Sequence, residues 1–177
     1  MMLFTGLSQN FWVNLCGFQL VWWLTILGRD QTQSLILFLL LMHLLLHARA
    51  ALELRVVLLC GLLGYAVDTC LTFMGVFTFR EHVNGASLPP LWLLLLWFGF
   101  CATLRQSLSM FIEKLALAAV CGAVAGSLTY LTAAKLGAVM LEYGMVSTGI
   151  LLAIIWAVLF PVLLWIADNL GESHAAA

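Results

Sequence analysis

Residues 146–167, VSTGILLAIIWAVLFPVLLWIA, decide the fold class of this chain. The segment carries no charged residue, and it is as long as the roughly 20 apolar residues that a helix needs to cross a bilayer. Hydrocarbon offers no hydrogen-bond partner to the backbone, so a crossing segment must pair its polar groups within its own helix. We therefore expect residues 146–167 to form a transmembrane helix.

The composition of the whole chain extends this expectation. Of its 177 residues, 64% are hydrophobic and 8% are charged, and the mean hydropathy is +1.12. Soluble domains carry about 25% charged residues, so most of this surface must face the lipid bilayer. The net charge of −1 excludes nucleic acid as a partner, because phosphate binding requires clustered Lys and Arg.

Charged residues, prolines and glycines divide the chain into six apolar runs. The predicted spans cover residues 10–28, 32–49, 56–78, 89–111, 115–136 and 146–167. Pro89 and Pro90 open the fourth, since proline suits the first turn of a helix. Short connections make consecutive helices antiparallel. The sequence thus predicts one domain, residues 1–177, with an all-α fold: a polytopic integral membrane bundle of about six transmembrane helices.

The distribution of basic residues gives a weak orientation. With the amino terminus inside, the cytoplasmic side holds Arg49, Arg55, Arg105 and Lys114. The outer side then holds Arg29, Arg80 and Lys135. Positive residues favour the cytoplasm, so we expect both termini there. The first apolar run lacks the basic region and cleavage site of a secretory signal, and we expect it to remain as a span.

Asp68 is the main candidate for a functional residue inside the membrane. It lies near the middle of the third predicted span, on one helix face with Gly61 and Gly64. Small residues allow helices to approach closely, so this face should contact protein. Ionisable residues in a membrane are costly and are usually paired or functional. Arg105 of the fourth span lies at a depth within reach of Asp68, either as a structural ion pair or in a site for a substrate or a proton.

Other polar residues are predicted at overlapping depths. Together with the first two they give five candidate binding residues: Gln19, His43, Asp68, Arg105 and Tyr130. A polar cavity would have this pattern, and so would hydrogen bonds between helices. His43 and His47 are four residues apart, a spacing that can present two imidazoles to a metal, but a site needs three or four ligands. We therefore predict no metal and no cofactor.

Motifs of known membrane enzymes are missing from the sequence. It contains no serine elbow, no HExxH and no nucleotide-binding loop, so no catalytic residue is predicted. Ala118, Gly122 and Gly126 form a ridge of small residues on the fifth span. Such a ridge is a packing face for another helix, for a second copy of the chain or for a membrane enzyme.

Short motifs along nearly the whole chain carry a family resemblance. They are Asn10-Phe11, Phe18-Gln19 and Trp22, then Gly64-Tyr65-Ala66-Val67-Asp68, then Pro90-Leu91-Trp92, Leu96-Trp97 and Ser107-Leu108. They resemble a family of small bacterial inner-membrane proteins catalogued as a domain of unknown function. The resemblance implies Asn in place of Arg105, so that a role common to the family would rest on Asp68 and Gln19. It also implies relatives encoded near fatty-acid-modifying enzymes.

Three functions remain open from the sequence. The first is a non-enzymatic protein that binds, moves or presents a lipid or small amphiphile in the polar band. The second is an accessory subunit that holds a lipid- or fatty-acid-modifying enzyme at the membrane. The third is a membrane enzyme that uses Asp68 as an acid or base.

Overall fold

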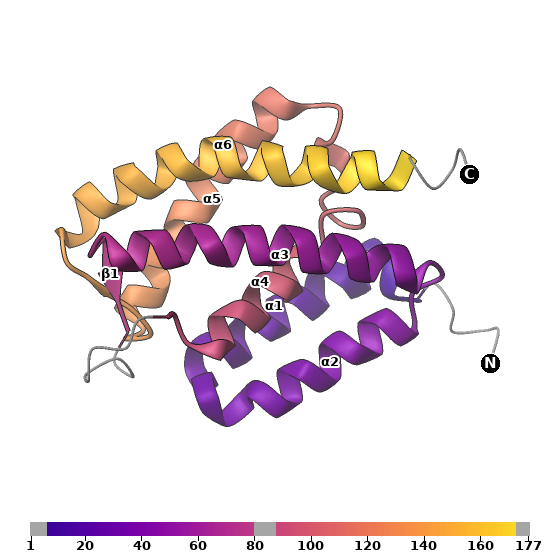
Figure 1. Cartoon of the computed structure of the whole chain (residues 1–177), viewed down its shortest axis with the longest axis horizontal. Helices are drawn as coiled ribbons and strands as arrows, with labels where there is room; N and C mark the ends of the chain where they lie inside the picture. Colours follow the sequence, from indigo (N-terminus) through magenta and orange to yellow (C-terminus); the bar gives the residue numbers. More distant parts are fainter. Residues whose placement is uncertain (1–6, 80–87, 173–177) are drawn as a thin grey trace.

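A computed structural model of the chain describes residues 7–79 and 88–172, and these residues form an all-α bundle (Figure 1). The helices are α1 (Phe11–Gly28), α2 (Gln33–Leu45), α3 (Ala50–Phe73), α4 (Leu91–Cys101), α5 (Leu115–Lys135) and α6 (Gly144–Glu172). Strands β1 (Phe77–Thr78) and β2 (Met140–Leu141) pair antiparallel. Short 3-10 turns cover Leu7–Gln9, Arg29–Thr32 and Ser109–Phe111. The predicted fold class is confirmed.

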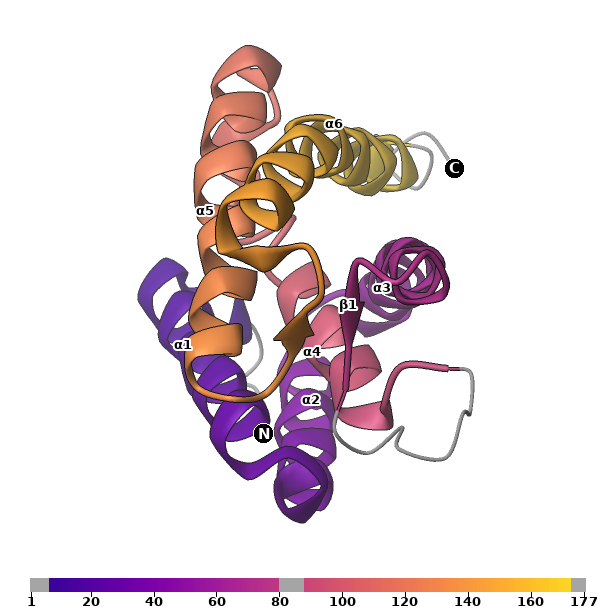
Figure 2. The same ribbon diagram turned by 90° about the vertical axis from the view of Figure 1, so that its left-hand side faces the viewer.

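The bundle has two ends that differ in what they carry. α1 begins and α6 ends at one of them, together with the turn between α2 and α3; we call it the terminal end (Figure 1). The opposite end carries β1 and the turn between α1 and α2, and we call it the sheet end (Figure 1). α5 and α6 pack mainly against each other, and α3 contacts both α4 and α6 (Figure 2).

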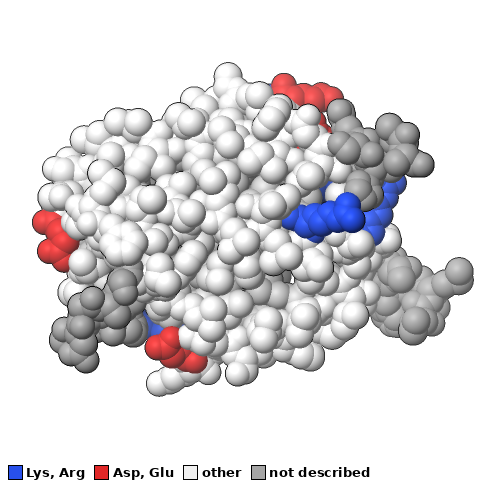
Figure 3. Space-filling model, in the orientation of Figure 1, with Lys and Arg blue, Asp and Glu red and all other residues white. Residues whose placement is uncertain are grey.

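Four segments of the described chain are long and apolar enough to cross a membrane. They are Phe11–Leu45, Ala50–Phe73, Leu115–Lys135 and Gly144–Gly171. The first contains α1 and α2, which fold into a hairpin (Figure 1), and α4 has only 11 residues. The count of about six spans is therefore not confirmed. Figure 3 shows a face that is largely uncharged between its two ends, as expected of a surface in lipid.

The turn between α1 and α2 is fixed by polar contacts. Arg29 adopts a φ of 47°, and its guanidinium donates a hydrogen bond to the carbonyl of Gly137 beside β2. Thr32 Oγ1 donates to the Leu24 carbonyl at 2.7 Å. These bonds close the hairpin and tie it to the end of α5. Arg80, which we assigned to the outer side, lies outside the described residues.

The bounds of four helices differ from the predicted spans, and one of them, α6, extends to Glu172 rather than to residue 167. α2 ends at Leu45 rather than near residue 49, and α3 begins at Ala50 rather than near residue 56. The charged stretch that we assigned to a loop is thus the first turn of α3, and it brings Glu53 into the bundle, where its side chain is fully buried. The last difference is in α4, which ends at Cys101 rather than near residue 111.

The early end of α4 has a cause in α1. In a continuous helix the carbonyl of Ala102 would accept from the amide of Gln106. Here it accepts from Asn14 Nδ2 at 3.0 Å, and the Gln106 amide donates to Thr103 instead. Asn14 Oδ1 also accepts from the hydroxyl of Ser107 at 2.7 Å. One buried amide on α1 therefore holds residues 102–108 in a series of turns.

The two helices that precede the strands, α3 and α5, have the same type of C-terminal ending. Gly75 after α3 and Gly137 after α5 have φ values of 69° and 73°, a left-handed conformation that favours glycine. After Gly75 the amide of Val76 donates to the Leu71 carbonyl at 2.9 Å, and the matching bond follows Gly137. This arrangement is the Schellman motif, and it leads each of the two helices into one of the paired strands.

Candidate functional site

Asp68 lies one turn beyond two glycines at which α3 contacts α4. A Cβ at Gly64 would lie 2.2 Å from Cε3 of Trp97, and one at Gly61 would lie 2.4 Å from the ring of Phe98. The glycines therefore give α4 the space in which its large side chains contact α3. The prediction that this face of α3 contacts protein is confirmed. Because α3 begins earlier than expected, Asp68 lies nearer the sheet end than the middle of its helix.

The Asp68 carboxylate is held by two neutral aromatic donors. Trp97 Nε1 on α4 donates to Oδ2 at 2.7 Å, and the hydroxyl of Tyr130 on α5 lies 2.8 Å from both carboxylate oxygens. Asp68 is 1% exposed. Three helices meet at this carboxylate, and both of its oxygens are already occupied by protein donors.

Arg105 is not the partner of Asp68, and the predicted ion pair is wrong. Among the described residues, the ion pairs shorter than 4.0 Å involve Glu53 and not Asp68. Arg105 lies near the terminal end, where its guanidinium would be 3.0 Å from a Cβ placed on Gly171 of α6. Since α4 ends at Cys101, Arg105 sits in the turns beyond it and does not follow the helical path that the prediction assumed.

The aromatic donors of Asp68 are covered by α6. The rings of Trp97 and Trp156 stack with centroids 5.4 Å apart and an angle of 6° between their planes. Trp156 reaches this position because Gly126 of α5 leaves room, since a Cβ there would lie 2.3 Å from the indole. Gly122 faces Phe160 in the same way. The small-residue ridge is thus occupied by α6 of the same chain, and it offers no exposed face to a second copy or an enzyme.

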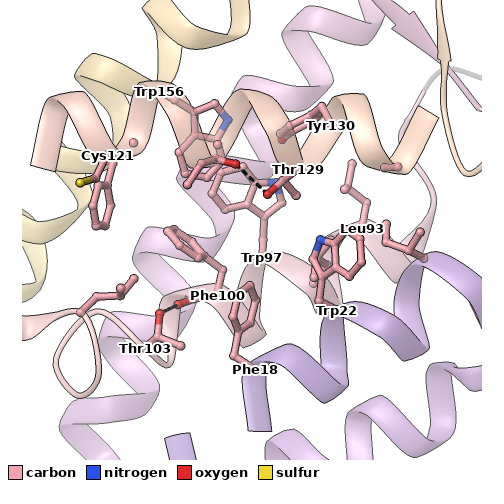
Figure 4. Close-up of a pocket in the computed structure, with 18 of the residues that line it drawn as sticks. Phe18, Trp22, Leu93, Trp97, Phe100, Thr103, Cys121, Thr129, Tyr130 and Trp156 are labelled. Atoms are coloured by element: carbon pink, nitrogen blue, oxygen red, sulfur yellow. Dashed lines mark hydrogen bonds between the residues drawn. The ribbon is translucent and has the colours of Figure 1, made fainter. Parts of the chain in front are cut away.

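An apolar cavity of about 290 Å³ adjoins this cluster. Its walls come from α1, α4, α5 and α6, and most of them are aromatic or small apolar side chains (Figure 4). The principal aromatic residues are Phe18, Trp22, Trp92, Trp97, Phe100, Tyr130 and Trp156. Leu15 of α1 and Ala125 of α5 also line it and are partly or fully exposed, so the cavity reaches the outer surface between these two helices.

Two polar groups in the cavity wall have no partner. The indole nitrogens of Trp22 and Trp92 are buried and make no hydrogen bond within the described chain. Trp22 is 8% exposed and Trp92 is 1% exposed, and both line the half of the cavity nearer the sheet end. A buried N–H without an acceptor costs about 1–3 kcal/mol, so these two donors are available to an acceptor that enters the cavity.

A second polar cluster lies at the terminal end. His43 Nε2 is 3.2 Å from Glu53 Oε1, and His47 Nε2 is 3.4 Å from Glu53 Oε2. The terminal amide nitrogen of Gln106 is 2.8 Å from His47 Nε2 and 3.3 Å from Glu53 Oε2. Burial lowers the pKa of His47, although the nearby Glu53 opposes the shift. No group of three His, Cys, Asp or Glu in the described part of the chain is arranged to hold a metal ion.

The structure therefore does not bring the five candidate residues together in one site. Asp68 and Tyr130 meet directly, whereas His43 belongs to the second cluster with Glu53. Gln19 is exposed on the outer face of α1, and Arg105 is half-buried near α6. Sequence analysis missed Glu53 and Gln106. A single acidic residue three positions after Ala50, at the start of a long apolar run, was the available signal for Glu53.

Comparison with known proteins gives one match. The family described as "Protein of unknown function (DUF2878)" matches residues 11–162, which include every element from α1 to most of α6. No curated protein and no solved structure matches the chain.

Proposed function

The chain belongs to the DUF2878 family, and we propose that it binds a single amphiphile, such as a fatty acid, in the cavity between α1, α4, α5 and α6. The observation that carries this proposal is the pair of unpartnered indole N–H groups, Trp22 and Trp92, in an otherwise apolar wall. An apolar tail would fill the aromatic part of the cavity. An acceptor oxygen of the head group would take the two free donors.

The dimensions and the lining support a small apolar ligand. Ligand pockets usually enclose about 300–1,000 Å³ and are lined by apolar and aromatic side chains with a few placed polar groups. This cavity, at about 290 Å³, lies just below the lower limit of that range and suits a small ligand. The opening between α1 and α5 faces the lipid-exposed side of the bundle, and a ligand dissolved in the bilayer could enter there without crossing water.

The alternatives have less support from the site. An enzyme that used Asp68 would need a reactive carboxylate within reach of its substrate, but Asp68 does not line the cavity and is shielded by Trp97 and Tyr130. An accessory subunit would need an interaction face, and the small-residue ridge suggested for that role packs on α6. Co-purification of a membrane enzyme with an empty cavity would favour the accessory role.

We further propose a bacterial cytoplasmic membrane with both termini in the cytoplasm. The start of α1 and the end of α6 lie at the same end of the bundle (Figure 1). Arg49 and Lys114 cap helices at this end, whereas Arg29 and Lys135 belong to the sheet end. The head group of the amphiphile would then lie in the outer half of the membrane.

The test uses two neighbouring tryptophans that differ in their position. Trp22→Phe removes one free donor from the cavity, and Trp23→Phe is its control because Trp23 is 44% exposed and does not line the cavity. Oleic acid is titrated into the purified protein in detergent, and the number of oleic acid molecules bound to each protein is measured by native mass spectrometry. One hydrogen bond contributes about 1 kcal/mol, so Trp22→Phe should weaken binding by a factor of about 5.

Trp23→Phe should leave oleic acid binding unchanged. Absence of saturable binding to the wild-type protein would overturn the proposal. Equal weakening by the two substitutions would also overturn it, because the bound oleic acid would then lie on the outer surface rather than in the cavity.

A further inference from the structure

The Glu53 cluster lies outside the proposed binding cavity and joins three parts of the chain. Glu53 belongs to the first turn of α3, His43 to the last turn of α2, and Gln106 to the turns that follow α4. Glu53 has 0% exposure and His47 has 5%. A carboxylate buried this completely must have its charge and its hydrogen bonds accounted for within the cluster.

The backbone determines which nitrogen of His47 carries hydrogen. The amide of Arg49 donates to His47 Nδ1 at 3.0 Å, and a backbone amide is always a donor. His47 Nδ1 is therefore an acceptor without hydrogen. Because the imidazole is neutral, its hydrogen is on Nε2, the nitrogen that faces Glu53 and Gln106.

Gln106 cannot satisfy both of its neighbours at once. If its NH₂ group faces the cluster, it donates to an ionised Glu53 at 3.3 Å, but it then opposes another donor, His47 Nε2–H, at 2.8 Å. If the amide is turned over, its oxygen accepts from His47. That oxygen then lies 3.3 Å from Glu53 Oε2, and two buried oxygens at this distance need a hydrogen between them.

We infer that Glu53, His47 and Gln106 form a proton-binding site in which Glu53 takes up one proton as the amide of Gln106 turns over. In the ionised state, Gln106 donates to Glu53. In the protonated state, the Glu53 hydroxyl donates to the Gln106 oxygen, which also accepts from His47. Glu53 Oε1 remains the partner of His43 in both states, so the added proton belongs on Oε2.

The charged and titratable neighbours are few. His43 faces Glu53 from α2, and the thiol of Cys101 interacts with it from α4. Arg105 acts on His47 from the turns beyond α4, and Arg49 contributes its backbone amide. Arg105 therefore bears on the cluster through His47.

A structural change at Gln106 can be transmitted to the cavity. Gln106 lies between Thr103 and Leu108 in the turns after α4, and these two residues line the terminal half of the cavity. The amide of Leu108 donates to the Thr103 carbonyl at 2.9 Å, so this segment is one bonded unit. Rotation of the Gln106 side chain therefore occurs on a segment that lines the cavity.

The test measures the proton directly and needs no amphiphile. Infrared spectra of the purified protein are recorded across a pH titration, and the spectrum of Glu53→Gln is subtracted to remove the exposed acids. We expect a pH-dependent carbonyl band of a protonated carboxylic acid that is lost in Glu53→Gln and persists in Asp68→Asn. Because Gln imitates a protonated Glu, Glu53→Gln should also fold and melt within a few degrees of the wild type.

Two results would overturn the site. One is the absence of a Glu53-dependent carbonyl band at every pH at which the protein stays folded. The other is failure of Glu53→Gln to fold, which would mean that the cluster requires the negative charge at all times. Neither result bears on oleic acid binding, so the site and the proposed function fail independently.

Discussion

Two carboxylates are buried in this bundle, and their surroundings differ in kind. Asp68, 1% exposed, accepts from an indole, which can only donate, and from a phenol hydroxyl. Glu53, 0% exposed, faces two imidazoles and an amide, and the amide can present either its NH₂ group or its oxygen. An ionised Asp68 therefore has one hydrogen-bonding arrangement, whereas the Glu53 cluster has two.

The difference distinguishes Asp68, an acid with a structural role, from Glu53, the acid that we propose to exchange a proton. Asp68 connects α3, α4 and α5 beside the cavity, and its donors are themselves packed against Trp156 of α6. Movement of either donor ring would break its packing against Trp156. Glu53 lies at the ends of two helices and beside the turns after α4, and a rotation of the Gln106 side chain is enough to change its partners. The predictions below challenge this contrast in order of expected effect.

Removal of the Asp68 carboxylate should have the largest effect. Asp68→Leu leaves the hydroxyl of Tyr130 and the indole N–H of Trp97 without acceptors, at about 1–3 kcal/mol each, so the free energy of unfolding should fall by about 3 kcal/mol. Thermal unfolding in one detergent, followed by near-ultraviolet circular dichroism, measures the loss. Asp68→Asn, which keeps an acceptor oxygen, is the matched control and should lose less.

A second substitution tests the reason for that loss. Addition of Tyr130→Phe to Asp68→Leu removes one of the stranded donors and should recover part of the stability. If the double variant instead melts lower than Asp68→Leu alone, the tyrosine hydroxyl is not the group that Asp68 satisfies, and the contrast with Glu53 is lost.

A change of pH should have an effect of intermediate size on stability, and this effect should come from His47 in the Glu53 cluster. Burial lowers the pKa of His47 below its ordinary value of 6.5 in the folded chain. The unfolded chain then binds more protons as the pH falls through 6.5, so the contribution of His47 to stability is complete above that pH and declines below it. Melting temperatures measured from pH 8 to pH 5 should show the decline, with a smaller slope in His47→Gln. An unchanged slope would assign the decline to another group.

The smallest expected effect is the coupling between Asp68 and Arg105. Because these residues do not meet, the losses caused by Asp68→Asn and Arg105→Gln should add to within about 0.5 kcal/mol in a double-mutant cycle. The same thermal unfolding assay provides all four values. A coupling well above this limit would restore the ion pair and would remove Asp68 from the class of acids held by neutral donors alone.

The fold class and several elements were predictable from sequence. The bounds of α1 and α5 agree with the predicted spans to within one residue, because Arg29 and Lys135 mark the ends of their apolar runs. Asp68 and Tyr130, which were predicted at overlapping depths in one polar band, meet in the structure. Depth in the membrane decided this prediction, and depth can be counted along a helix at 1.5 Å per residue.

The direction of side chains was not predictable around helices that lack a stripe of small residues. In a soluble helix, alternation of polar and apolar residues marks the buried face, but in lipid both faces are apolar and this periodicity is weak. Gln19 was therefore placed inside although it is exposed. Gln106 was missed for another reason: its position depends on the break after Cys101, and the break depends on Asn14, 88 residues away from the carbonyl it binds.

That bond between Asn14 and Ala102 also bears on how the chain is made. Asn14 leaves the ribosome long before Ala102 does, so the amide that ends α4 is already present when residues 102–108 are synthesised. At 1.5 Å per residue the 11 residues of α4 reach about 16 Å, roughly half of the 30 Å hydrocarbon core. The turns that follow α4 take their shape from a neighbouring helix and not from their own sequence alone, so α1 determines the backbone of residues 102–108 as well as forming a wall of the cavity.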